Sequence, residues 1–251
     1  MWLSGLDEMT KLSSSSILIC LGLLMVGNLA GWAIAEMFVG EAAGRDFLEF
    51  GTATAAIIFL MQVLAFGFCK KGVSGEFIFR GMSGLSLIWI LLSLVLPLVW
   101  VKDFGFQIKF ALIGLSLSLF AFNFEKGRRH FNKQWERQSP FIEKTLKKNS
   151  PTLEWEEVGK HLALSVSMHI PGVPRTLESV LSALLVVSMI VGLNLRKIFP
   201  IFSMFAWGIP CVVASSMLVQ MIALNFLQGA KIFKLEKERG IKFRSSLKSH
   251  G

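Results

Sequence analysis

The hydrophobic residues of this chain gather into blocks, and each block is about as long as a membrane-spanning helix. The blocks cover approximately residues 15–35, 53–68, 84–101, 104–124, 177–195 and 200–227. A helix needs about 20 apolar residues to cross the hydrocarbon core of a bilayer. A soluble fold of 251 residues could not bury a composition that is 53% hydrophobic. The sequence therefore predicts an all-α, polytopic transmembrane bundle of about six spans.

Basic residues are distributed unevenly between the two sides that six spans would create. The side with both termini carries one Lys or Arg in the head, three in 70–82, ten in 125–176 and seven in 231–251, hence 21, whereas the other side carries four. Loops rich in Lys and Arg stay in the cytoplasm. We therefore expect a multi-pass protein of the cell membrane, taken here as a bacterial inner membrane, with both termini cytoplasmic.

The first block has an alternative interpretation as a cleaved signal peptide. Ala33-Ile34-Ala35 resembles a small-residue cleavage site. However, the head has one lysine against two acidic residues, and the apolar stretch is longer than a usual signal-peptide core. We favour a retained span, and cleavage would leave the orientation of the other helices unchanged.

The spans divide the chain into four regions. These are a four-span membrane region (1–124), a basic cytoplasmic segment (125–176), a two-span membrane region (177–230) and a basic cytoplasmic tail (231–251). We expect the tail to extend the last helix and then to fray. The segment 125–176 is the main stretch available to build structure outside the membrane.

Short helices are predicted in the cytoplasmic segment. Residues 125–137 should continue the fourth span as a basic stalk, and Ser139-Pro140 and Ser150-Pro151 should each begin a new helix, because serine caps helices and proline suits their first position. The second of these helices is amphipathic, and it either packs on the chain's own helices or binds a partner or the lipid surface. The residues proposed for a partner or anionic headgroups are Arg128, Arg129, Trp155, Val158 and Leu162.

Amides inside the spans form a second group of candidate residues. Asn28, Gln62 and Gln220 lie deep, where an unpaired amide is costly and usually bonds to a neighbouring helix. They predict interhelical hydrogen bonds, with the lining of a solute path as the alternative. Pro210 interrupts the last span and could contribute to such a path. Asn123 lies near a predicted helix end, where we expect water to satisfy it.

Two glycines in the first span predict a close helix crossing. Gly27 and Gly31 form a GxxxG pattern, which lets two helix backbones approach each other. The pattern alone leaves open whether the partner helix is internal or belongs to another subunit.

No residue pattern predicts catalysis. The four histidines lie outside the spans, no two have the spacing of a helical metal site, and the phosphate-loop, HExxH and GxSxG patterns are lacking. We expect no cofactor and no metal. The net charge of +9 reflects topology, so we do not expect nucleic acid as a partner.

The function expected from the sequence is therefore non-enzymatic. We expect a subunit or accessory factor of a membrane assembly, with a small-solute or ion transporter or channel as the alternative and a membrane enzyme third. The expected partners are the lipid bilayer, its anionic headgroups, and other membrane subunits or a second copy of the chain.

Overall fold

The computed structural model describes residues 14–69, 72–102, 104–146, 152–155, 174–240 and 242–244. Its helices are α1 (Ser14–Phe38), α2 (Glu41–Cys69), α3 (Val73–Ser93), the 3-10 helix η2 (Leu96–Trp100), α4 (Phe106–Leu146), α6 (Arg175–Leu195) and α7 (Pro200–Arg239). Two three-residue strands, β1 (Thr152–Glu154) and β2 (Lys242–Arg244), pair in parallel. In the described part of the chain, α1, α2, α3, α4 and α7 are long and apolar enough to cross a membrane. The predicted all-α bundle is confirmed.

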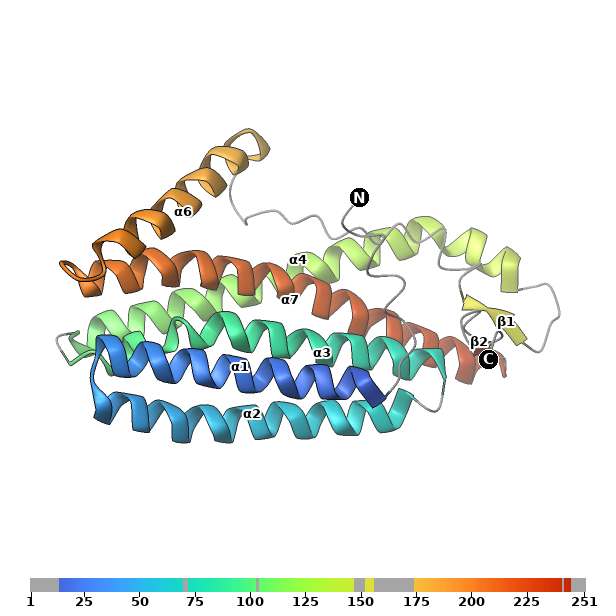
Figure 1. The fold of residues 1–251 in the computed structure, drawn as a ribbon. Coiled ribbons are helices and arrows are strands. Elements are labelled where there is room, and N and C mark those ends of the chain that lie inside the picture. The colour runs from blue at the N-terminus through green and yellow to red at the C-terminus, as the bar shows by residue number, and fades with distance from the viewer. Residues whose placement is uncertain are drawn as a thin grey trace.

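Helices α3 and α7 lie at the centre of the bundle. Helices α1, α2 and α3 pack against one another, while α7 packs against α3, α4 and α6 (Figure 1). Helix α6, whose apolar stretch is the shorter Ser179–Gly192, leans away from the other helices. Helix α1 begins and α7 ends toward the same end of the bundle (Figure 1).

The predicted start of the third span at residue 84 is wrong, because α3 already begins at Val73. Residues 70–82 are expected in the loop between the second and third spans, but Glu76 and Arg80 lie in α3. In the structure they form an ion pair of 3.0 Å one helical turn apart, with the Glu76 side chain only 6% exposed. Mutual neutralisation at this spacing lets both charges belong to a helix.

The predicted helix start at Ser139-Pro140 is also wrong, because α4 continues through Pro140 to Leu146. Proline deprives the carbonyl of Glu136, four residues earlier, of its donor, but this residue is exposed and water can replace the lost bond. Beyond the proline, Ile142 is buried in an apolar cluster, which favours continuation of the helix.

Residues from distant parts of the chain form this apolar cluster at the end of the bundle. We name it the end cluster, and its buried members are Val73, Ile142, Trp155, Ile232 and Phe243. The rings of Trp155 and Phe243 meet edge to face with centroids 5.3 Å apart. Phe243 lies in β2, and Trp155 directly follows β1. The pairing of these strands means that the predictions of a helix beginning at Pro151 and of a merely fraying tail fail at residues 152–154 and 242–244.

Candidate functional site: buried amides and a basic face of α4

The partner of the GxxxG pattern is internal. A Cβ atom built at Gly27 would lie 2.8 Å from Cδ1 of Trp89 on α3, and one built at Gly31 would lie 2.8 Å from the carbonyl oxygen of Ser93. The Gly31 position would also overlap the ring of Phe47 on α2. The two glycines therefore allow α1 to sit against both α2 and α3.

Two of the deep amides join the first three helices. The indole Nε1 of Trp89 donates to Oδ1 of Asn28 at 2.9 Å, which ties α3 to α1. Nε2 of Gln62 donates to the hydroxyl of Ser86 at 2.7 Å and lies 3.0 Å from the carbonyl oxygen of Met82, which ties α2 to α3. Gln62 is fully buried, and its Oε1 has no hydrogen-bond partner in the structure.

The third deep amide joins α4 to α7. Nε2 of Gln220 donates to Oδ1 of Asn123, and Nδ2 of Asn123 lies 3.1 Å from the hydroxyl of Ser216. Asn123 is fully buried, so the prediction that water satisfies this residue is wrong. The helix continues for more than twenty residues beyond it, and α7 covers its side chain.

Helix α7 passes through Pro210 without ending, and the proline lies near its contact with α6. Proline has no N–H, so the carbonyl of Ala206, four residues earlier, loses its helical donor. The hydroxyl of Ser188 on α6 lies 3.4 Å from this carbonyl oxygen and 2.7 Å from that of Leu185. A Cβ atom at Gly192 would come within 2.7 Å of the Ala206 side chain, so the two helices touch closely here.

Basic side chains line one face of α4 just beyond its apolar part. Lys126, Arg129, His130 and Lys133 recur at intervals of three, one and three residues, which places them on one face of a helix. The spacing was already visible in the sequence, although only Arg129 among these four was selected there as a candidate. In the structure these four side chains line one cavity.

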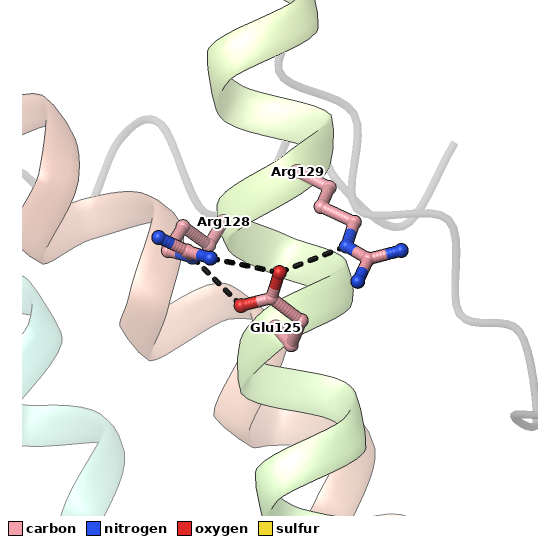
Figure 2. A network of polar contacts seen from close by, with 3 residues as sticks. All are labelled: Glu125, Arg128 and Arg129. Atoms are coloured by element: carbon pink, nitrogen blue, oxygen red, sulfur yellow. Dashed lines mark hydrogen bonds and ion pairs between the residues drawn. The ribbon is translucent and has the colours of Figure 1, made fainter.

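Glu125 organises the two arginines that follow it (Figure 2). Nε and Nη2 of Arg128 donate to its two carboxylate oxygens at 2.7 and 2.9 Å, and Nε of Arg129 donates to Oε1 at 2.8 Å. These bonds lower the pKa of Glu125 to about 2, and the hydrogen bonding by Arg128 contributes most to this shift. Two positive charges therefore share one carboxylate, which leaves the group with a net charge of about +1.

A cavity of about 230 Å³ lies between α4 and α7. We call it the α4–α7 cleft; its lining residues are Lys126, Gly127, Arg129, His130, Lys133, Gln220 and Leu224. A Cβ atom at Gly127 would lie 3.0 Å from the carbonyl oxygen of Gln220, so this glycine permits the close approach of the two helices. Nε2 of His130 is buried and has no hydrogen-bond partner in the structure.

The residues predicted to bind a partner or lipid headgroups do not lie together on one surface. Trp155 is only 4% exposed and packs in the end cluster, which agrees with the alternative that this segment packs on the chain's own helices. Val158 and Leu162 lie outside the described residues, as do His161 and His169. Arg128 and Arg129 are exposed, with side chains 52% and 79% accessible.

The site offers charge and hydrogen-bond donors. Within the described ranges, no group of three or more His, Cys, Asp or Glu side chains could hold a metal ion. Comparison with protein-family models, curated proteins and solved structures finds no match to this chain. The functional argument therefore depends on the geometry.

Proposed function

We propose that this membrane protein is a non-enzymatic subunit or accessory factor of a membrane assembly, and that α4 and α6 contact an apolar transmembrane helix of another subunit. The uneven packing of its spans supports this proposal. Only 6% of the residues in the apolar window of α4 are buried, against 44% in each of α3 and α7. Helix α6 leans away from the bundle and exposes Leu184 by 59% and Val187 by 53%.

The pairing of the deep amides supports the same function. Asn28, Gln62 and Gln220 each take part in a hydrogen bond between helices. Amides used in this way hold helices together, and they are not free to replace the hydration shell of a passing solute. This favours an assembly factor over a transporter.

Site-specific photocrosslinking in cells tests the proposal. A photoreactive residue would replace Leu117 on α4 or Leu184 on α6, with Ile57 on α2 as the matched control, because Leu117 and Ile57 are both 62% exposed. We expect a discrete protein adduct from α4 and α6 and none from α2. Lipid adducts alone at all three positions, together with a monomeric mass after gentle extraction, would contradict the proposal.

In the proposed orientation, the end of the bundle that contains the end cluster faces the cytoplasm of a bacterial cell. The excess of Lys and Arg on that side supports it. The test introduces a cysteine at Lys144 on α4 or at Lys102 near η2 and treats intact cells with a membrane-impermeant thiol reagent. The proposed orientation predicts labelling at position 102 and none at position 144. Labelling of position 144 but not of position 102 in intact cells would contradict this orientation.

A small-solute or ion transporter is the second candidate. Gln220 supports it, because this residue lines the α4–α7 cleft and also bonds to the fully buried Asn123. Proton and potassium flux into liposomes containing the purified chain would test it. A transporter requires flux above that of protein-free liposomes and a loss of this flux in Gln220→Leu; equal fluxes would exclude these two ions.

A further inference from the structure

The cleft between α4 and α7 combines several features of an anion site. Three Lys or Arg side chains line it, and its described lining contains no carboxylate. The buried Nε2 of His130 lacks a partner, whereas Gln220 lines the cleft on the opposite helix with its amide nitrogen bonded to Asn123. Phosphate oxygens are the acceptors that such a set of charged and neutral donors binds well.

The network at Glu125 leaves positive charge available to the cleft. Arg128, which does not line the cavity, donates two of the three hydrogen bonds to the carboxylate. Arg129 uses Nε for the third bond, and Figure 2 draws no bond from its two terminal nitrogens. The guanidinium of Arg129 therefore keeps the part that best matches a phosphate group.

The position of the cleft along the helices indicates a lipid as the source of the phosphate. The apolar part of α4 from Phe106 to Phe124 is 19 residues long. At about 1.5 Å per residue it spans roughly 28 Å, close to the thickness of the hydrocarbon core. On α7, Gln220 lies at a matching distance from Pro200. The four basic residues thus fall within the two and a half turns that follow the core, where headgroups lie.

We propose that the α4–α7 cleft binds the phosphate of an anionic phospholipid headgroup. The volume of about 230 Å³ is below the range of roughly 300–1,000 Å³ typical of small-molecule pockets, so it suits a phosphate ester better than a nucleotide. Leu224 and Gly127 provide an apolar part of the lining beside which the glycerol backbone can lie. This proposal is independent of the protein partner proposed above.

Binding of phospholipid to the detergent-solubilised full-length chain tests this site. The probes are phosphatidylglycerol, phosphatidylcholine as the lipid without net negative charge, and inorganic phosphate as the soluble alternative. The test variant is Arg129→Gln with Lys133→Gln. The matched control is Arg137→Gln with Lys144→Gln, which removes two exposed charges from the same helix outside the cleft. Thermal melting of each purified variant establishes that it is folded.

The expected result is selective loss of binding in the cleft variant. Each Lys or Arg near an anionic headgroup strengthens binding about fivefold, so the test variant should bind phosphatidylglycerol about 30-fold more weakly, and the control should change severalfold less. An equal loss in both variants would mean unspecific surface attraction and would overturn the proposal. Binding of inorganic phosphate with the same dependence on Arg129 and Lys133, without selective binding of phosphatidylglycerol, would overturn the lipid assignment.

Discussion

Adding a single methyl group at Gly31 should destabilise the bundle, whereas the same change at Gly22 should not. A Cβ atom at Gly31 would overlap the ring of Phe47 and lie 2.8 Å from the carbonyl oxygen of Ser93, whereas one at Gly22 would meet nothing within 4 Å. Phe47 is fully buried, so its ring has little room to move. Gly22→Ala therefore serves as the control for Gly31→Ala on the same helix.

The expected magnitude follows from comparing the two variants. Both replace glycine by alanine inside α1, so the gain in helix propensity, about 1 kcal/mol in water, is common to both and cancels. The difference that remains is the cost of overpacking, about 1–3 kcal/mol in a well-packed core. We expect the free energy of unfolding of Gly31→Ala to lie below that of Gly22→Ala by this amount.

Unfolding of the purified chain by a denaturing detergent measures this difference. Trp89 and Trp100 lie beside Phe47, with ring centroids 6.5 and 5.9 Å from it, so tryptophan fluorescence reports on this contact. Equal unfolding free energies for Gly31→Ala and Gly22→Ala would refute the close crossing of α1 with α2 and α3. A large loss in both variants would also contradict the reasoning, because Gly22 has open space around it.

Other substitutions test the remaining contacts. Asn123→Leu removes two hydrogen bonds to α7 and should cost about 1–2 kcal/mol in detergent unfolding, whereas Asn194→Leu, which loses only a bond within its own helix, should cost less. The lowered pKa of Glu125 predicts that its stabilising effect is present above about pH 4.5 and is lost as the pH falls toward 2, so melting of wild type and Glu125→Gln should converge there. Burial raises the pKa of Glu236, so wild type should lose stability relative to Glu236→Gln as the pH rises through this pKa. The glutamine side chain can still accept the bond from the backbone N–H of Phe243. A stability difference that does not change with pH would contradict this prediction. Trp155→Ala should cost about 3–5 kcal/mol and expose the tail to limited proteolysis, and an unchanged digestion pattern would contradict its role in the end cluster.

Local signals in the sequence were sufficient for several elements. The predicted span 177–195 differs by two residues from the observed α6, and the proline at 200 begins α7 as expected. The basic stalk after Phe124 continues α4 as predicted. Hydrophobic length, a proline at a helix start and a charged run that lacks proline are each local features, so they can be recognised without the rest of the fold.

The predictions failed where a distant residue decides the local structure. Asn123 is buried because it bonds to residues 93 and 97 positions later, and no pattern around it announces these partners. The strand at 152–154 exists because 242–244 pairs with it. His130 lines a cleft only because α7 packs beside α4, which the local sequence does not indicate.

The sequence by itself determined that this chain is a helical membrane protein, because blocks of apolar residues of this length are stable in water only when they are buried. It also determined the basic face of α4, since the spacing of Lys126, Arg129, His130 and Lys133 is a property of any helix. Only the tertiary structure decided that the GxxxG pattern is used internally, that the deep amides bond to α3 and α4, and that the basic face meets Gln220. The physical reason is that helix formation depends on near neighbours, whereas a cleft requires two helices that the chain brings together over almost a hundred residues.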